Sequence, residues 1–261
     1  MKTVAIYSLK GGVGKTSLAV NLAWAAATRS AHRTLLWDLD AQAASSFILG
    51  GDEAPDGETH GEARTIFARD TSPDRLIRAT ATSGLDLLPA DASLRTLDSF
   101  FAGLGKKRRL HRLTEQLDGR YDRVILDCPP GLTETSEQIL RAADLIVVPV
   151  IPSPLSRRAL DEIVAHLDGG EAKKDGRRGT ILPVFNMVDR RRLLHTAALD
   201  AEPRWPVVPM ASAMEMMAAH REPVFAFAPR SPAALGLDAL WTIVERWLTR
   251  AERPPAVGAA A

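Results

Sequence analysis

The residues with the clearest capacity for chemistry lie near the start of the chain, from Lys10 to Thr16, in the order Lys-Gly-Gly-Val-Gly-Lys-Thr. An apolar segment precedes them and a helix-forming segment begins at Leu18, so the pattern predicts a strand, a glycine-rich loop and a helix. Glycines accept positive φ angles and let successive backbone N–H groups point at an anion. The N-terminus of the following helix adds a partial positive charge. The segment is therefore predicted to bind phosphate.

Two side chains of this loop have predicted roles at a phosphate site. Lys15 is expected to reach the β- and γ-phosphates of a nucleotide, and the Thr16 hydroxyl to hold Mg²⁺. The loop differs from the common G-x-x-x-x-G-K-[ST] form, because Leu9 replaces its first glycine and a second lysine, Lys10, opens it. A glycine-rich turn can also join a strand to a helix without binding anything, but the flanking strand and the Lys-Thr pair favour a nucleotide site. The predicted nucleotide-binding residues of the loop are Gly11, Gly12, Val13, Gly14, Lys15, Thr16 and Ser17.

Three carboxylates follow predicted strands and are candidates for metal binding and catalysis. Asp127 closes an apolar strand and is the natural carboxylate on the metal side of a phosphate loop. Asp38 and Asp40 lie on one side of their chain segment by the two-residue period of a strand. We predict that Asp38 supports the metal site and that Asp40 positions the attacking water. In the alternative interpretation, one of them only caps a helix that begins near Ala41.

The composition is that of an ordinary globular protein. The chain has 261 residues, of which 46% are apolar and 25% are charged, and its formal net charge is +1. Affinity for a polyanion would therefore require local clusters of basic residues. Cys128 is the only cysteine, which excludes an intramolecular disulfide and fits a reducing compartment. We find neither a signal-peptide pattern nor an apolar run of the roughly 20 residues that span a bilayer, and expect a cytoplasmic protein.

Strand and helix patterns alternate along the chain, which predicts an α/β fold with a doubly wound, mostly parallel sheet flanked by helices. The first 252 residues are expected to form a single domain, and residues 253–261 a disordered tail. The predicted strands are 3–7, 34–38, 84–89, 122–127, 145–150, 180–186 and 205–209. The predicted helices are 18–27, 73–80, 93–102, 106–117, 133–142, 156–167, 190–199, 212–219 and 233–250. Residues 50–61 and 169–179 are predicted loops.

These motifs make the chain similar to the ParA/MinD family of deviant Walker ATPases, whose loop pattern is Lys-Gly-Gly-x-Gly-Lys-Thr. Asp38-Leu39-Asp40-Ala41-Gln42 resembles the first switch of that family, and residues 121–131 resemble its Walker B strand and second switch. The resemblance implies a P-loop NTPase fold, ATP and Mg²⁺ as cofactors, and slow basal hydrolysis of ATP to ADP and phosphate. It also implies that Lys10 reaches the partner's phosphates in an ATP-dependent homodimer.

Ala41 departs from the family pattern, whereas Asn186 matches it. Ala41 stands where the family usually has proline, and the absence of that ring removes a restraint on the first switch. Asn186, at the end of a predicted strand, matches the position from which family members contact the adenine base. A turn-forming asparagine is an equally available interpretation of Asn186.

Members of the family that resemble ParA bind DNA without sequence preference and respond to an activating partner protein. DNA binding requires basic residues, and the candidates are Arg190, Arg191, Arg192 and Arg221. The triplet lies where the resemblance places a DNA-contacting arginine, with Arg191 as the best match, and the resemblance implies a nucleoid-associated protein. Basic clusters can also be solvated surface.

Two other functions stay open at this stage. A regulator resembling MinD would use its closing helix, residues 233–250, on a membrane, but the mixed charge of that helix favours docking on the sheet. A small-molecule amidoligase or synthetase of the wider superfamily would need a further polar substrate pocket. The leading hypothesis is a ParA-like ATPase that positions a plasmid, a chromosome or a protein assembly.

Overall fold

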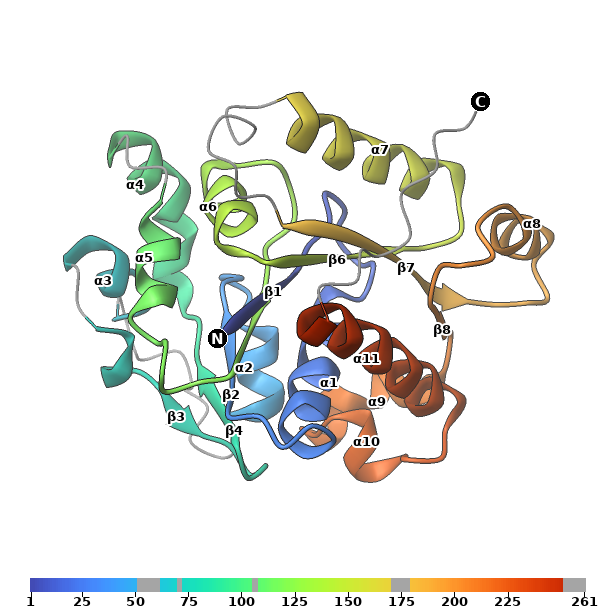
Figure 1. Ribbon diagram of the computed structural model, residues 1–261, viewed down its shortest axis with the longest axis horizontal. Helices are drawn as coiled ribbons and strands as arrows, with labels where there is room; N and C mark the ends of the chain where they lie inside the picture. The colour runs from blue at the N-terminus through green and yellow to red at the C-terminus, as the bar shows by residue number, and fades with distance from the viewer. Residues whose placement is uncertain (51–61, 70–71, 105–107, 170–178, 251–261) are drawn as a thin grey trace.

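The computed structural model describes residues 1–50, 62–69, 72–104, 108–169 and 179–250. Its centre is an eight-stranded sheet with the strand order β3-β4-β2-β5-β1-β6-β7-β8 (Figure 1). All neighbouring strands are parallel except the edge pair β3 and β4, which confirms the doubly wound, mostly parallel sheet. The strands are β1 (Lys2–Ile6), β2 (Thr34–Asp38), β3 (Arg78–Ala79), β4 (Leu85–Leu88), β5 (Arg123–Asp127), β6 (Leu145–Val150), β7 (Thr180–Val188) and β8 (Val207–Pro209).

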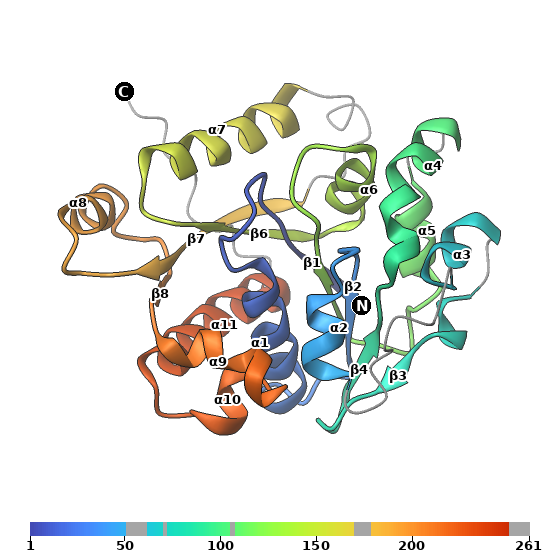
Figure 2. The ribbon, with the colours of Figure 1, turned by 180° about the vertical axis from the view of Figure 1, so that it is seen from behind.

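Helices cover both faces of this sheet. Figures 1 and 2 show α1, α2, α9, α10 and α11 on one face, α4 to α7 on the other, and α8 beyond the β8 edge. The helices are α1 (Lys15–Thr28), α2 (Ala44–Leu49), α3 (Glu62–Arg69), α4 (Leu97–Leu104), α5 (Arg109–Glu115), α6 (Glu134–Ala142), α7 (Pro154–Gly169), α8 (Leu193–Ala201), α9 (Ser212–His220), α10 (Val224–Phe227) and α11 (Pro232–Arg250). Short 3₁₀ turns occupy Pro73–Arg75 and Ala92–Thr96.

The sheet separates two hydrophobic cores. Along β1, Val4 and Ile6 belong to the core under α1 and α11, whereas Ala5 belongs to the core under α6 and α7. Alternate side chains of a strand point to opposite faces, so a strand covered on both sides is apolar at every position. This explains why β6 is buried along its whole length.

The order of the strands brings the site together. β1 pairs with β5 on one side and with β6 on the other, and β5 also pairs with β2. The strands are parallel, so the carboxyl ends of β1, β2 and β5 lie at one edge of the sheet. Ligands of open α/β sheets bind at that edge.

The predicted helix 73–80 is wrong. Only Pro73–Arg75 makes a helical turn, capped by the Ser72 side chain, and the chain then extends into β3. β3 pairs antiparallel with β4, with Arg78 opposite Leu87. The pairing satisfies backbone groups at an edge that would otherwise be open, and this tertiary gain outweighs local helix preference.

Several other boundaries differ from the prediction. The helix predicted over 190–199 begins only at Leu193, because residues 190–192 form a turn that follows Asp189. The sequence patterns also missed the short α2 and α10 and the helix α3. Predicted features that fall on residues 51–61, 105–107, 170–178 and 251–261, including the tail 253–261, lie outside the described residues.

Candidate nucleotide site

The glycine-rich loop joins β1 to α1 with two residues in the left-handed region. Gly12 has a φ of 71° and Gly14 a φ of 87°, and Gly14 is the N-cap of α1. A Cβ atom on Gly14 would lie 2.4 Å from Nδ2 of Asn186. Both the backbone angle and the close approach require glycine at this position. The loop therefore has the local structure that the sequence predicts for a phosphate cradle.

The two lysines of the loop differ in their surroundings. Lys15 is 7% exposed, and its Nζ donates to the backbone oxygen of Lys10 at 3.2 Å. Burial lowers the pKa of Lys15, although the nearby carboxylate of Asp127 opposes the shift. Lys10 is partly exposed, and its ammonium forms no ion pair within the described part of the chain. Both ammonium groups thus have donors left for an anion.

Asp127 lies at the end of β5, directly opposite Asp38 in the register of β2 and β5. Its Oδ2 accepts a hydrogen bond from Ser45 Oγ at 2.5 Å. Its Oδ1 is buried without a donor among the described residues. Burial raises the pKa of Asp127, and hydrogen bonds from Ser45 and Thr16 oppose that rise. A buried carboxylate oxygen without a partner, next to the Thr16 hydroxyl, fits the hard oxygen ligands that Mg²⁺ takes beside nucleotide phosphates.

Asp38 is fully buried, and both of its oxygens accept hydrogen bonds. Oδ2 accepts from the backbone N and the Oγ of Ser46 at 2.9 and 2.8 Å, and Oδ1 accepts from the backbone N of Asp40 at 3.1 Å. Burial first, and then the negative charge of Asp127, raise the pKa of Asp38. Its contacts hold the first turn of α2 in place. A role for Asp38 at the metal stays a prediction.

A cavity of about 250 Å³ opens over the loop. Asp40 lines the same cavity as the loop, and its Oδ1 accepts from the backbone N of Gln42 at 2.9 Å. The complete lining is Gly11, Gly12, Gly14, Lys15, Thr16, Asp40, Gln42 and Pro130. The structure therefore brings the predicted water-positioning carboxylate to the predicted phosphate site. Pro130, which lies within the second-switch segment, is a lining residue for which the sequence predicted no individual role.

Asn186 lies in β7 and is 1% exposed. Its Nδ2 donates to the backbone oxygen of Val13 at 2.8 Å, so it supports the phosphate loop directly. Its Oδ1 is buried and accepts nothing from the described residues. An orphaned acceptor beside the loop fits the exocyclic amino group of adenine, which is a donor. The next residue, Met187, has a φ of 56°, which is strained for a residue other than glycine.

Ser45 and Ser46, whose hydroxyl groups donate to Asp127 and Asp38, were not predicted from the sequence. Ser46 Oγ also accepts from the backbone N of Ala90 at 2.9 Å, so α2 is tied to the ends of β2, β4 and β5. The available signal was weak: two small hydroxyl residues follow the first-switch segment within a few positions. Nothing in their spacing shows which carboxylate each will meet.

The predicted DNA-contacting arginines come from two separate elements. Arg191 pairs with both oxygens of Asp189 at 2.9 and 3.0 Å, and Arg192 lies 3.5 Å from the same carboxylate. Arg190 is exposed and has no ion pair with a described residue. Arg221 follows α9, donates to the backbone oxygen of Phe47 at 3.2 Å and stacks on the Phe47 ring at 5.0 Å. The structure therefore separates Arg221 from the triplet.

The described residues contain neither a cluster of metal-ligating side chains nor a helix that could span a membrane. Across the described ranges, no cluster of three or more His, Cys, Asp or Glu side chains could hold a metal ion. A magnesium ion at Thr16 and Asp127 would thus take most of its ligands from phosphate and water, as is usual for this ion. In the same ranges, none of the helices has the length and apolarity that a bilayer crossing requires.

A glycine loop at a helix N-terminus, two lysines, and carboxylates at the ends of neighbouring parallel strands define a P-loop nucleotide-binding protein. A model of the family described as an AAA domain matches residues 1–175. A ParA family protein of Chlamydia trachomatis is 34% identical over 172 residues, which cover 65% of this chain and 66% of that protein. The chromosome partitioning protein ParA of Caulobacter vibrioides is 32% identical over 205 residues, which cover 74% of this chain and 72% of that protein.

The chain therefore belongs to this AAA-domain family, and within it to the ParA-like P-loop ATPases. Among solved structures, Cyanothece McdA without nucleotide superposes with a TM-score of 0.79 at 21% identity, covering 94% of this chain and 99% of that one. Cobyrinic acid a,c-diamide synthase from Mycobacterium smegmatis, with bound ADP and magnesium, superposes with a TM-score of 0.79 at 24% identity, covering 98% of both chains. At these identities the likeness shows a shared fold.

Proposed function

We propose that this chain is an ATP-hydrolysing positioning protein of the ParA type. ATP with Mg²⁺ binds at the glycine loop and closes a homodimer, the dimer holds non-specific DNA, and a partner protein stimulates hydrolysis at the cargo. We further propose that residues 1–252 form a single ATPase domain that works in the cytoplasm on the nucleoid. The family assignment and the loop geometry support this proposal.

The position of Lys10 is the observation that best supports an ATP-dependent dimer. Its backbone oxygen holds Lys15, while its own ammonium has no ion pair with any described residue. An ammonium that is partly exposed at the mouth of a phosphate site is available to a triphosphate bound by a second copy. Charge-assisted hydrogen bonds of this kind are stronger than neutral ones, so ATP itself would become part of the interface.

Residues of the loop and of the neighbouring strand ends have separate roles in the proposed hydrolysis of ATP. Lys15 and the loop N–H groups bind the β- and γ-phosphates, and Thr16 with Asp127 would hold Mg²⁺, which neutralises charge on the phosphates when bound. Asp40 orients the attacking water, since it shares the cavity with Lys15 and Thr16. The fixed backbone of Asp40, whose N–H donates to Asp38, sets the direction of that carboxylate.

The DNA-binding part of the proposal rests mainly on Arg190, because Arg191 and Arg192 already share Asp189. Each phosphate contact steepens the salt dependence of binding. Retention of the full chain on non-specific duplex DNA should be measured with ATP, with ADP and without nucleotide. We expect retention only with ATP. Equal or absent retention in all three conditions would contradict the proposal.

A membrane regulator resembling MinD is less well supported, because the apolar face of α11 is packed into the core of the protein. Leu237, Leu240 and Val244 are fully buried, and Trp241 is 3% exposed, all in the core shared with α1. A helix that docks its apolar face on the sheet cannot offer that face to lipid. Co-sedimentation with anionic vesicles that is lost when residues after Leu237 are deleted would favour the membrane function instead.

A small-molecule synthetase shares the fold, as the likeness to cobyrinic acid a,c-diamide synthase shows for that enzyme. Such an enzyme would need convergent polar groups for its substrate. A further cavity in the described part of the structure, with a volume of about 230 Å³, has a mainly apolar lining. This cavity therefore does not supply the convergent polar groups that a synthetase would need.

A further inference from the structure

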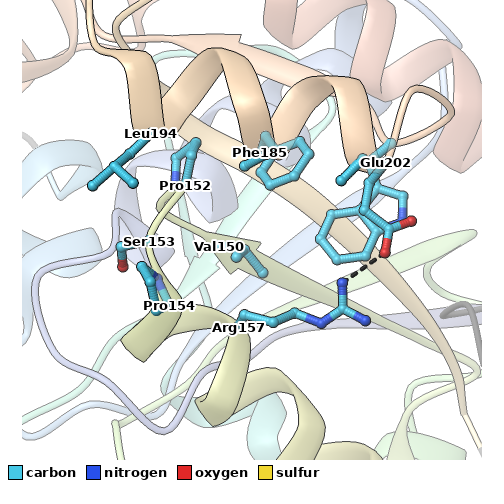
Figure 3. Close-up of a pocket in the computed structure, with 11 residues that line it drawn as sticks. Val150, Pro152, Ser153, Pro154, Arg157, Phe185, Leu194 and Glu202 are labelled. Atoms are coloured by element: carbon cyan, nitrogen blue, oxygen red, sulfur yellow. Dashed lines mark hydrogen bonds and ion pairs between the residues drawn. The ribbon is translucent and has the colours of Figure 1, made fainter. Parts of the chain in front are cut away.

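The apolar cavity lies between the start of α7, the end of β6 and the helix α8 (Figure 3). It has a volume of about 230 Å³ and shares no lining residue with the nucleotide cavity. The lining residues are Val150, Pro152, Ser153, Pro154, Arg157, Phe185, Leu194, Ala198, Ala201, Glu202 and Trp205. A dry cavity of about 150 Å³ holds a group the size of benzene. This pocket therefore has room for one leucine or phenylalanine side chain.

One side of the pocket is held rigid by the side chain of Arg157. Its Nη1 donates to Glu202 at 2.6 Å, and its guanidinium lies 5.5 Å from the centre of the Trp205 ring. Figure 3 shows Arg157 pointing across to Glu202. The Trp205 ring in turn packs on Phe185, with ring centroids 4.8 Å apart. A pocket held in this way loses little side-chain entropy when it is filled.

Trp205 also carries an unused hydrogen-bond donor. The residue is 4% exposed, and its Nε1 has no acceptor among the described residues. Native proteins seldom leave a buried N–H group unpaired. This nitrogen has almost no exposed surface, so Trp205 lines the pocket with the carbon atoms of its ring.

Leucines stand exposed at the mouth of the pocket and beside it. Leu194, which lines the pocket, is 65% exposed, and its neighbour Leu193 is 86% exposed. Leu155, one residue after Pro154, is 67% exposed. Single exposed leucines are common, but three of them around an apolar pocket mark a surface that another apolar group can cover.

The charges beside the pocket select an acidic occupant. Arg158 and Arg204 adjoin lining residues in the chain, are exposed, and pair with no carboxylate of the described residues. Among the described residues, Asp200 is the one exposed carboxylate that adjoins a lining residue in the chain. Arg190, before α8, adds another exposed guanidinium. Glu202 and Asp161 already form ion pairs with Arg157. The unpaired charge is therefore mainly positive, which favours acidic residues in the partner.

We propose that this pocket is a docking site for an acidic segment of a partner polypeptide. One bulky apolar side chain of the segment fills the cavity against the Trp205 ring, and flanking carboxylates meet Arg158 and Arg204. The site requires no nucleotide. Its test is therefore independent of the ATPase proposal.

The test uses the full chain labelled with ¹⁵N, whose five tryptophans give five indole N–H signals. The probe is the blocked hexapeptide Glu-Asp-Leu-Phe-Glu-Asp. Its two counterparts carry lysine in place of every acidic residue or alanine in place of leucine and phenylalanine. We expect one indole signal, absent from Trp205→Phe, to shift with the acidic peptide, because the occupant packs against the Trp205 ring. Binding should be at least about tenfold weaker for each counterpart, since a buried apolar side chain contributes about 1.5–3 kcal/mol.

Two matched variants distinguish peptide binding in the pocket from peptide binding on the exposed surface of α8. Ala198→Trp fills the cavity and should abolish peptide binding, whereas Ala197→Trp, at an exposed position that does not line it, should leave binding unchanged. Both must keep the unfolding temperature of the parent to be informative; should Ala198→Trp unfold, Leu194→Glu replaces it. The proposal is overturned if none of the peptides moves the indole signal, or if the lysine peptide binds equally well. A shift produced instead by duplex DNA, or by raising the concentration of the protein alone, would assign the pocket to DNA or to a second copy.

Discussion

Ser45 Oγ donates a hydrogen bond of 2.5 Å to Asp127 Oδ2 and thereby ties the first turn of α2 to the end of β5. The next residue, Ser46, makes the corresponding contact with Asp38 on β2. Two hydroxyl groups of one short helix thus hold the two carboxylates that face each other at the carboxyl edge of the sheet. Any displacement of Asp127, for example by a metal ion, would act directly on α2.

Replacement of Ser45 measures this contact. Ser45→Ala leaves a buried carboxylate oxygen without its donor, and we expect the free energy of unfolding to fall by about 1–3 kcal/mol. Urea denaturation of the nucleotide-free protein measures the change. Ser99→Ala serves as a matched control, because that hydroxyl is exposed and donates to the backbone oxygen of Thr96, at the end of the preceding 3₁₀ turn. Equal losses for the two variants would mean that the contact with Asp127 adds no stability.

Lys15 is predicted to carry nucleotide binding. Lys15→Ala removes a buried ammonium that has donors free for phosphate, and loss of its charge-assisted hydrogen bonds should weaken nucleotide binding by roughly 100-fold or more. Isothermal titration with ATP and Mg²⁺ provides the measurement. Lys2→Ala, at a half-exposed lysine paired with Asp144, should bind as the parent does. Unchanged affinity in Lys15→Ala would exclude the loop as the phosphate site.

Lys10 is predicted to act between subunits and not within one. Lys10→Ala should keep the affinity of the monomer for ATP within about threefold, while the ATP-dependent dimer weakens by roughly 10- to 150-fold, the equivalent of about 1.5–3 kcal/mol. Light scattering with a non-hydrolysable ATP analogue reports the dimer. A variant that dimerises like the parent would show that Lys10 does not reach the phosphates of a second copy.

Asp40 is predicted to position the attacking water. Asp40→Ala should form an ATP-dependent dimer and hydrolyse ATP about 100-fold or more slowly, since a positioned base or water contributes about that much to the rate. Single-turnover hydrolysis of labelled ATP avoids limits set by product release. Asp74→Ala, at an exposed carboxylate paired with Arg120, is the control. Hydrolysis by Asp40→Ala at the rate of the parent would show that Asp40 does not position the attacking water.

His195 provides a test of pH dependence. It is 4% exposed, and its Nδ1 accepts from the backbone N of Asp189 at 3.0 Å, which requires that nitrogen to be unprotonated. Burial first, and then the positive charge of Arg192, lower the pKa of His195 from its ordinary value of 6.5. Below about pH 6.5 the unfolded chain therefore binds more protons than the folded one, and the free energy of unfolding falls as the pH falls.

The matching variant is His195→Gln, which keeps an acceptor and does not titrate. Between about pH 7 and pH 5 the stability of the parent should fall more steeply than that of the variant. Urea unfolding curves at several pH values give both slopes. Identical slopes would show that His195 makes no contribution to acid sensitivity.

Much of this protein was determined by local sequence. The loop from Lys10 to Thr16 folds as expected because glycines, an apolar strand and a helix former act on neighbouring residues. Buried parallel strands are recognised in the same way, since a strand covered on both faces must be apolar throughout. The residues Asp38, Asp40 and Asp127 were found by their position at strand ends, which also depends only on local pattern.

Other features were decided only by the tertiary structure. The helix predicted over 73–80 became an edge strand because β4 offered unpaired backbone groups. Ser45 and Ser46 acquired their roles because parallel pairing of β2 with β5 sets Asp38 opposite Asp127. The pocket at Trp205 forms where the consecutive elements β6 and α7 meet the consecutive elements β7 and α8, and parallel pairing of β6 with β7 sets these two units side by side. Contacts of this kind depend on which elements become neighbours, and no local pattern contains that information.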